Sequence, residues 1–360
     1  MKILHTEASL GWGGQEIRIL SESRGLIARG HDVRLLCPPE ARVFEEARRW
    51  NVPAIAMPIG RKRLGGLRAV LEWLRANPCD VVNTHSSTDS WLVALAVLAM
   101  GRPFPIVRTR HISAPVPTNW LTAWLYQRAT RRVITTGESI RAQLIERNGY
   151  TPGRIESIPT GIDETRFRPG DRVAARRALG LPEDLTLVGI VATLRSWKGH
   201  RYLIDAVAGM PASVGLVIVG DGPQREALQA QSAVLNGRCW MPGNQEDVLP
   251  WFHALDVFAL PSYANEGVPQ ALVQAMMSGL ACVTTAAGSI GELARHDETA
   301  LVVPAQNVDA LRAAIDLFVT DAGLRARLGA AAREYCVRRY SYTSMLDRME
   351  TVYRNVAGRE

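Results

Sequence analysis

The chain has 360 residues, of which 47% are hydrophobic and 21% charged, which is typical of a soluble globular protein long enough for two domains. Its formal net charge is +7, and its five cysteines include no C-x-x-C pair, so the sequence predicts neither a disulfide framework nor a zinc site. No apolar run is long enough to cross a bilayer and the N-terminal segment is too polar for a signal peptide, so we expect a cytoplasmic protein.

The positive charge lies in the first part of the chain. Residues 1–164 contain 22 Lys and Arg against 15 Asp and Glu, whereas residues 165–360 contain 20 of each kind. This bias favours an anionic partner for the first part, either a phosphorylated molecule or an anionic membrane surface. A basic surface that only meets solvent is the alternative interpretation.

The first half of the chain alternates short apolar runs with helical stretches. A helix is predicted from Gln15 to about Arg29, and Gly30 is well placed to end it. Strands are predicted at residues 3–6, 33–37, 81–82, 106–107 and 133–135. Alternating strands and helices indicate a mostly parallel sheet.

The second half repeats this alternation after a polar segment. Residues 160–172 contain Gly and Pro but have no apolar periodicity, so we place a linker there. The strands that follow are predicted at residues 187–192, 216–219, 257–260 and 281–284. The sequence therefore predicts an α/β protein with two sheets and a cleft between them, and ligands of such sheets bind beyond the carboxyl ends of the strands.

Glycines and side chains with binding chemistry follow several of these strand ends. They are Gly13 and Gly14, His85, His111, Arg195 and Lys198, Gly220 and Gly222, and Glu266. The turn GWGGQE lets backbone N–H groups approach a ligand beside a helix N-terminus, although a tight structural turn is the alternative. Its incomplete G-x-G-x-x-G pattern disfavours a nicotinamide-dependent oxidoreductase.

Three of these positions have specific chemical interpretations. Lys198 is one of only three lysines in the chain, so its place beside Arg195 favours a phosphate ligand over an exposed basic loop. His111 is suited to bond a substrate hydroxyl, whereas a buried core histidine is the commoner case. Glu266 precedes a helix predicted at residues 269–279, where it either meets a ligand or only caps the helix.

That helix is expected to bury one face and leave the other open to a ligand. Periodicity assigns the buried face to Leu272, Ala275, Met276 and Gly279. The opposite face is assigned to Gln270, Gln274 and Met277. Gln274 therefore stands one to two turns into the helix, on the side that we expect to meet ligand.

Taken together, these segments resemble the retaining glycosyltransferases of the large GT-B family 4. The segments that carry the resemblance are GWGGQEIRILSESRGLIARGHDVRLLCP, IPTGIDETRFRP, VGDGPQREAL, MPGNQEDVLPWFHALDVFALPSYANEG and SGLACVTTAAGSIGEL. The resemblance implies two facing Rossmann-like domains, with residues 1–165 taking the acceptor and residues 166–340 the nucleotide-sugar donor. It also implies that a last helix, at about residues 342–358, returns to the first domain.

The resemblance also assigns roles to individual residues. The implied catalytic set is His111, which matches a T-x-H motif and would contact the transferred sugar, Glu266 at the sugar hydroxyls, and Arg195 and Lys198 at the donor diphosphate. Further donor contacts are implied for Gly13, Gly14, Gly220, Gly243, Gly267, Val268 and Gln274. Acceptor contacts are implied for His85, Arg108 and Arg110.

The chain departs from the family pattern at two donor-site positions. The family's phosphate-binding Arg usually lies five residues before the Lys, where this chain has Thr193, so Arg195 is the substitute. Gln274 stands where the family has a second Glu for the ribose hydroxyls. Glutamine keeps an acceptor oxygen, adds donors and removes the charge, which bears on the strength of ribose binding.

The predicted function is transfer of a sugar from an NDP-sugar, with UDP and GDP favoured, to a hydroxyl group of a glycan or lipid-linked glycan. The resemblance implies that transfer retains the anomeric configuration. We expect no metal or cofactor, and the chain has no Asp-x-Asp pair, H-E-x-x-H, P-loop or G-x-S-x-G motif. Bacterial lipopolysaccharide or envelope polysaccharide synthesis is the expected pathway, and nucleic acid is not an expected partner. A nucleotide-sugar epimerase of the same fold and a non-catalytic nucleotide-sugar-binding protein are the alternatives.

An anionic membrane surface is a further predicted partner, through peripheral binding. In residues 61–75, leucine and valine side chains fall on one helical face, surrounded by Arg61, Lys62, Arg63, Arg68 and Arg75. Aromatic residues lie close in sequence to a second basic group, namely Trp120, Trp124 and Tyr126 beside Arg128, Arg131 and Arg132. This combination suits a lipid–water interface, whereas a buried amphipathic helix with ordinary charges is the alternative.

Overall fold

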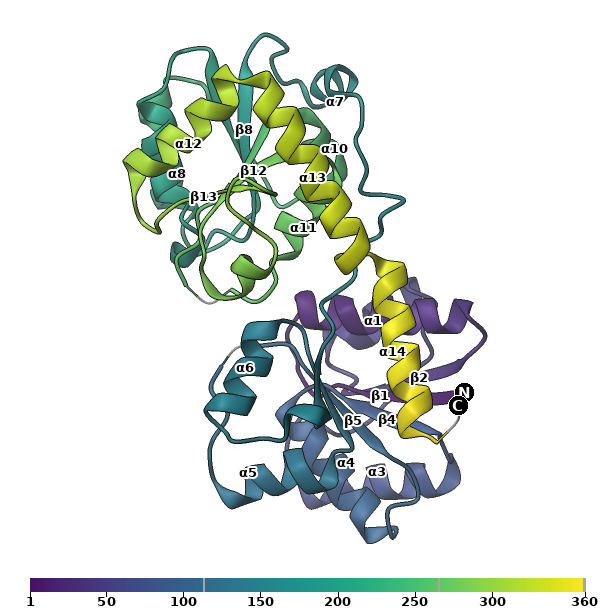
Figure 1. The fold of residues 1–360 in the computed structure, drawn as a ribbon. Coiled ribbons are helices and arrows are strands. Elements are labelled where there is room, and N and C mark those ends of the chain that lie inside the picture. The colour runs from purple at the N-terminus through teal and green to yellow at the C-terminus, as the bar shows by residue number, and fades with distance from the viewer. Residues whose placement is uncertain (113, 265, 359–360) are drawn as a thin grey trace. The chain divides into compact units, whose positions relative to one another are not determined.

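The computed structural model describes residues 1–112, 114–264 and 266–358, and the chain divides into two compact units (Figure 1). Unit 1 comprises Met1–Gly161 and the residues from Thr343 onward, and unit 2 comprises Ile162–Tyr342. Each unit buries its own hydrophobic core. Among the described residues, no helix combines the length and the apolar character that a bilayer-spanning segment requires.

Unit 1 is built around a parallel sheet with the strand order β3-β2-β1-β4-β5-β6-β7. The strands are β1 (Lys2–Thr6), β2 (Asp32–Cys37), β3 (Ala54–Ala56), β4 (Val81–Thr84), β5 (Ile106–Arg110), β6 (Arg132–Thr135) and β7 (Ile155–Ser157). The helices are α1 (Gly14–Ala28), α2 (Arg42–Arg49), α3 (Leu64–Ala76), α4 (Ser87–Ala99), α5 (Trp120–Trp124), α6 (Glu138–Glu146) and α14 (Tyr342–Val356). Because helices cover both faces of a parallel sheet, the central strands β1, β4 and β5 are buried along most of their length, polar residues included.

Unit 2 has a second parallel sheet, with the strand order β10-β9-β8-β11-β12-β13. The strands are β8 (Thr186–Val191), β9 (Val214–Val219), β10 (Cys239–Gly243), β11 (Val257–Leu260), β12 (Ala281–Thr284) and β13 (Leu301–Val302). The helices are α7 (Arg172–Leu179), α8 (His200–Ala208), α9 (Arg225–Ser232), α10 (Leu249–Ala254), α11 (Gln270–Met277), α12 (Val308–Thr320) and α13 (Ala322–Tyr340). The two units are therefore both Rossmann-like.

The predicted α/β fold class is confirmed, and each predicted strand overlaps an observed one. Four strands were not predicted, namely β3, β7, β10 and β13. Three of them are only two or three residues long, and β10 is largely half-buried and contains a proline. Such segments carry little apolar periodicity, so the sequence alone does not separate them from loops.

The expectation that Met277 lies on the open face of α11 is wrong. Met277 is 0% exposed, as is Val273, because α11 packs against α13 as well as against its own sheet. A helix covered on two sides buries a wider arc than one apolar stripe. Gln270 and Gln274 remain half-buried on the outer side of α11.

Buried polar contacts join α14 to the rest of unit 1. The Tyr353 hydroxyl donates a hydrogen bond to Glu22 Oε1 of α1 (2.6 Å) and accepts one from Asn83 Nδ2 of β4 (2.7 Å). Burial, followed by the nearby Glu22 charge, raises the pKa of Tyr353 well above its usual value. The hydroxyl is therefore a neutral donor, and the last helix of the chain contributes to the core of unit 1.

Replacing Tyr353 with Phe should destabilise unit 1 by about 1–3 kcal/mol, because two buried partners each lose a hydrogen bond. Tyr150→Phe is the matched control, since the Tyr150 hydroxyl is buried without a hydrogen-bond partner among the described residues. Its removal should leave the free energy of unfolding nearly unchanged or slightly increased. Urea unfolding followed by circular dichroism measures both, and equal losses in the two variants would contradict the role given to Tyr353.

Candidate functional site

In unit 2, two loops bring a lysine and a glutamate together. Lys198 ends a short helical turn after β8, and Glu266 lies in the loop after β11, the neighbour of β8 in the sheet. Lys198 Nζ lies 2.8 Å from Glu266 Oε1 and 3.0 Å from Oε2. The Glu266 side chain is only 4% exposed, so its charge depends on the lysine as a partner. The fold thus pairs two predicted site residues that are 68 positions apart.

Backbone contacts hold these two loops against each other. Tyr263 N donates a hydrogen bond to Trp197 O over 2.9 Å. Gly199 has a φ of +80°, and a Cβ atom there would lie 2.1 Å from the carbonyl oxygen of Pro261. Both the conformation and the space therefore require glycine. This close approach determines where the preceding Lys198 side chain lies.

A third loop, after β12, fixes the backbone of Glu266 through residues that were not predicted for the site. Ser289 N donates a hydrogen bond to Glu266 O over 3.2 Å. Gly288 has a φ of +56°, and a Cβ atom there would lie 2.0 Å from the same oxygen. Their sequence signal was a glycine after a predicted strand, in the segment AAGSIGEL. Gly267 and Val268, which follow Glu266, are half-buried.

The other residues predicted for donor binding in unit 2 are less constrained. Arg195 is exposed, with its guanidinium carbon 5.5 Å from the centre of the Trp197 ring, and it forms no ion pair within the described part of the chain. The half-buried side chain of Gln274 has no hydrogen-bond partner among the described residues. Gly220 N donates a hydrogen bond to Gly243 O over 2.9 Å, which joins the ends of β9 and β10. Arg195 and Gln274 are therefore both free to bind a ligand.

In unit 1, the predicted glycines open the first helix. Gly13 is the N-terminal capping residue of α1 and Gly14 is its first residue. No side chain within the described residues caps this end, which leaves backbone N–H groups of the first turn for water or a ligand. Nearby, Gln15 donates a short hydrogen bond to Glu7. Burial, followed by the charge of Asp89, raises the pKa of Glu7 to about 8, so this carboxyl group is largely protonated at neutral pH.

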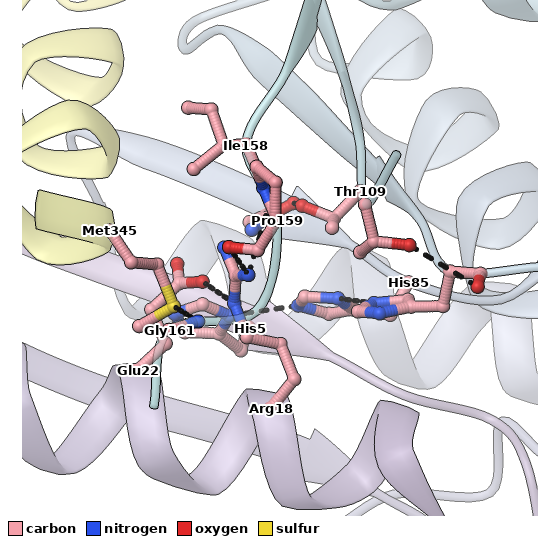
Figure 2. A network of polar contacts seen from close by, with 12 residues as sticks. His5, Arg18, Glu22, His85, Thr109, Ile158, Pro159, Gly161 and Met345 are labelled. Carbon is pink, nitrogen blue, oxygen red and sulfur yellow. Dashed lines mark hydrogen bonds and ion pairs between the residues drawn. The ribbon is translucent and has the colours of Figure 1, made fainter. Parts of the chain in front are cut away.

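Three histidines form a hydrogen-bonded chain at the carboxyl ends of neighbouring strands. Two of them, His5 and His85, are labelled in Figure 2. His5 Nδ1 lies 2.9 Å from His85 Nε2, and His85 Nδ1 lies 2.9 Å from His111 Nε2. His5 belongs to β1, whereas His85 and His111 directly follow β4 and β5. His5 was not predicted for the site, because a histidine inside an apolar strand has no sequence signal that separates it from the core.

Both ring nitrogens of His85 contact other histidines, so its ring has no free nitrogen with which to bind the acceptor substrate. Burial lowers the pKa of His85 well below its usual value. Burial, followed by the charge of Arg18, lowers the pKa of His111 to about 3. All members of the chain are therefore neutral at physiological pH. Even here, no group of three or more His, Cys, Asp or Glu among the described residues is arranged to hold a metal ion.

The two arginines predicted for acceptor binding differ in their surroundings. Arg108 is 4% exposed, and its guanidinium carbon lies 4.5 Å from the centre of the Tyr126 ring. Its Nε and Nη1 atoms have no hydrogen-bond partner among the described residues. Arg110 instead donates to the Tyr126 hydroxyl over 3.3 Å and to the backbone oxygen of Ala114. Arg108 forms no ion pair within the described part of the chain, although its charge interacts with that of nearby Asp89, so an anionic ligand would give this buried guanidinium a direct partner.

Acidification should destabilise unit 1 through its buried histidines. Because the pKa of His111 is lowered from 6.5 to about 3, its contribution to stability is complete above pH 6.5 and is lost as the pH falls toward 3. His111→Gln should remove up to about 1.4 kcal/mol of this loss per pH unit. Urea unfolding between about pH 7 and pH 5 measures the difference, with the exposed His296→Gln as control. Identical pH dependence in wild type and His111→Gln would contradict the prediction.

Two family models and a set of named proteins match this chain. The model described as "Glycosyl transferases group 1" matches residues 171–335, and the model described as "Glycosyltransferase Family 4" matches residues 12–166. The chain is 29% identical to a D-inositol 3-phosphate glycosyltransferase from Mycobacterium tuberculosis, over 96% of this chain and 79% of that protein. It is 26% identical to the protein of the same name from Mycobacterium ulcerans, over 96% and 82% of the two chains.

Solved structures with the same fold include proteins from two bacteria. Anabaena HepE in complex with UDP superposes with a TM-score of 0.87 at 20% identity, over 99% of this chain and 100% of that chain. A glycosyltransferase from Rickettsia africae superposes with a TM-score of 0.89 at 18% identity, over 99% and 98% of the two chains. With both halves matched by family models, this chain belongs to the group 1 glycosyltransferases of family 4, and it is a transferase with the GT-B fold.

Proposed function

We propose that this enzyme transfers a sugar from a UDP-sugar to a hydroxyl group of an anionic or lipid-linked glycan, with retention of the anomeric configuration and without a metal ion. The observation that carries the proposal is the ion pair of Lys198 and Glu266 at the strand ends of unit 2. It places a compact cation, suited to the leaving diphosphate, beside a carboxylate that is suited to sugar hydroxyls.

The reaction requires the protein to stabilise the negative charge that develops on the leaving diphosphate. As the bond between the anomeric carbon and the diphosphate breaks, the diphosphate gains negative charge, which Lys198 and Arg195 would stabilise. The acceptor oxygen forms its new bond to the anomeric carbon on the same face, and the hydroxyl proton passes to a diphosphate oxygen. His111 would contact the transferred sugar. No protein group needs to change its covalent state.

The choice of donor draws on similar proteins and on one free side chain. Solved structures of Anabaena HepE, 20–21% identical to this chain, contain UDP, UDP and glucose, or UDP-glucose. The amide of Gln274, which has no hydrogen-bond partner among the described residues, would bind the ribose hydroxyls, using its oxygen as an acceptor and its nitrogen as a donor. Backbone groups near Gly220 and Gly243 would approach the nucleotide. We therefore take UDP as the first donor to test, with GDP as the next.

An anionic acceptor is supported by charge and burial in unit 1. Arg108 is buried and forms no ion pair within the described residues, although its charge interacts with that of nearby Asp89, and the whole net charge of +7 arises within residues 1–164. Relatives bear the name D-inositol 3-phosphate glycosyltransferase, which includes a phosphorylated molecule. WaaG, described as involved in lipopolysaccharide biosynthesis, has the same fold, with a TM-score of 0.71 at 19% identity over 99% and 100% of the two chains. Synthesis of a bacterial envelope glycan is the pathway that we propose.

Replacing Lys198 with Ala should lower kcat/KM for transfer from UDP-sugars by roughly 100-fold or more, because the developing diphosphate charge loses its nearest cation. The measurement is a transfer and hydrolysis screen with UDP-, GDP- and ADP-sugars on the purified protein. Arg201→Ala removes an exposed cation three residues along the chain and should leave the rate unchanged. An unchanged rate in Lys198→Ala would refute the phosphate role of this lysine.

The same screen separates the alternative functions. Turnover of the donor to an epimer without any acceptor would indicate a nucleotide-sugar epimerase. Donor binding by thermal shift, with neither transfer nor hydrolysis, would indicate a non-catalytic binding protein.

We further propose that unit 1 binds an anionic membrane surface. Large apolar side chains are exposed on α3, α4 and α5, namely Leu64, Leu95, Leu98, Trp120 and Leu121. Leu64 is 84% exposed and Trp120 is 76% exposed. Arg61, Lys62 and Arg63 directly precede α3, which packs on α4. Exposed apolar groups beside basic residues suit the interface of an anionic bilayer.

The full-length protein should therefore sediment with phosphatidylcholine vesicles only when these contain phosphatidylglycerol. The double change Leu64→Gln and Trp120→Gln should weaken partitioning roughly tenfold, since two apolar anchors are lost. Leu317→Gln is the control, because Leu317 is 51% exposed on α12 of unit 2. Sedimentation that does not depend on the anionic lipid, or equal effects of the two changes, would rule out this surface.

A further inference from the structure

The histidine chain of unit 1 has one closed end and one open end. At the closed end, His5 Nε2 is buried and has no hydrogen-bond partner among the described residues. At the open end, His111 is half-buried, and its Nδ1 forms no hydrogen bond within the described part of the chain. The chain of rings therefore runs from the core of unit 1 toward its surface. It ends at the residue expected to meet the transferred sugar.

Proton sharing along this chain is restricted to two arrangements. Each neutral imidazole has one N–H and one lone pair, and each contact between rings needs one of each. In the first arrangement, His5 Nδ1 donates to His85 Nε2, and His85 Nδ1 donates to His111 Nε2. In the second, both hydrogen bonds run in the opposite direction. The protonation of His111 is thus tied to that of His5, two rings away.

The buried end decides between the two arrangements. In the first arrangement, His5 Nε2 carries a lone pair, whereas in the second it carries a hydrogen atom. In both, this buried nitrogen has no hydrogen-bond partner among the described residues. A buried N–H without an acceptor is more costly than an unused lone pair, which is tolerated more readily. The first arrangement is therefore favoured. It leaves the proton of His111 on Nδ1, the nitrogen at the open end.

The surroundings of His5 hold its ring in place and keep the chain neutral (Figure 2). The Tyr353 ring meets the His5 ring edge-on, with 6.4 Å between the ring centres. Arg18 donates to Glu22 over 2.9 Å and to the backbone oxygen of Pro159 over 2.7 Å, so its charge is fixed close by. Burial, with the Arg18 charge, opposes protonation of His5 more than Glu22 favours it. Protonation of His5, which would disrupt the directional hydrogen bonds of the chain, is therefore disfavoured.

We propose that His5 and His85 are positioning residues that fix His111 as the tautomer protonated on Nδ1, so that it presents an N–H donor to an oxygen of the transferred sugar. The identity of that ligand rests on the proposed function. The tautomer itself is a property of the folded chain and is measurable without substrate. This role replaces the acceptor contact predicted for His85, whose ring nitrogens are both used.

Substitutions at His5 test the direction of the chain. In His5→Asn, the side-chain amide takes the place of Nδ1–H as the donor to His85, so the His111 tautomer should be kept. In His5→Ala, the vacated polar space admits water, which can either donate to or accept from His85 Nε2, so His85 and His111 should populate both proton arrangements. Circular dichroism and thermal unfolding show whether each variant folds, and the two changes remove the same imidazole.

Nitrogen-15 NMR of histidine-labelled protein gives the first readout. In the wild type and in His5→Asn, Nδ1 of His111 should have the chemical shift of a protonated ring nitrogen. In His5→Ala, its shift should move toward the average of the two tautomers. An unprotonated Nδ1 in the wild type would overturn the proposed direction. An unchanged His111 shift in folded His5→Ala would overturn the positioning role.

Steady-state kinetics gives the second readout once a donor is known. In His5→Ala, kcat should fall roughly tenfold with little change in KM for the donor, because the lost donor hydrogen bond acts at the reacting sugar. His5→Asn should restore most of the rate. A rise in KM alone would contradict the positioning role. If no donor is turned over, the proposed function fails, whereas the NMR result still decides the tautomer.

Discussion

Parallel pairing of the strands decides which residues of this protein can meet. In each sheet, the carboxyl ends of neighbouring strands lie at the same edge, so residues far apart in sequence reach one place. Adjacent β1, β4 and β5 bring His5, His85 and His111 together, and adjacent β8 and β11 do the same for Lys198 and Glu266. An antiparallel neighbour would send its end to the opposite edge and separate each set.

The two units differ in how they compensate the cost of burying ionisable side chains. Unit 2 keeps a charged carboxylate nearly buried and compensates it with a lysine at two short contacts. Unit 1 removes the charge instead, because burial and the Arg18 guanidinium keep His85 and His111 neutral. A charged pair suits a ligand that brings its own charge, such as a diphosphate. A neutral, directional chain suits recognition of a hydroxyl oxygen.

Segments distant from these sites help to shape them. Tyr353, from the last helix, contacts the ring of His5, bonds Glu22 and accepts from Asn83, while Thr109 donates to the other end of that amide. These contacts link α14 to the strands that carry the histidine chain. In unit 2, glycine in the loop after β8 permits the close approach that aligns Lys198. A glycine and a residue near the end of the chain therefore determine the geometry of side chains that would meet the ligand.

The sequence by itself determined the alternation of strands and helices and the residues that follow the longer strands, because apolar periodicity and turn chemistry are local properties. It also pointed to Lys198 and Glu266 individually. Only the tertiary structure decided that these two form an ion pair, that His85 is enclosed between two other histidines, and that Met277 is buried. His5 and Gly288 were not predicted for the same reason, because their roles depend on which strands and loops are neighbours. Strand order is a long-range property that local sequence patterns do not encode.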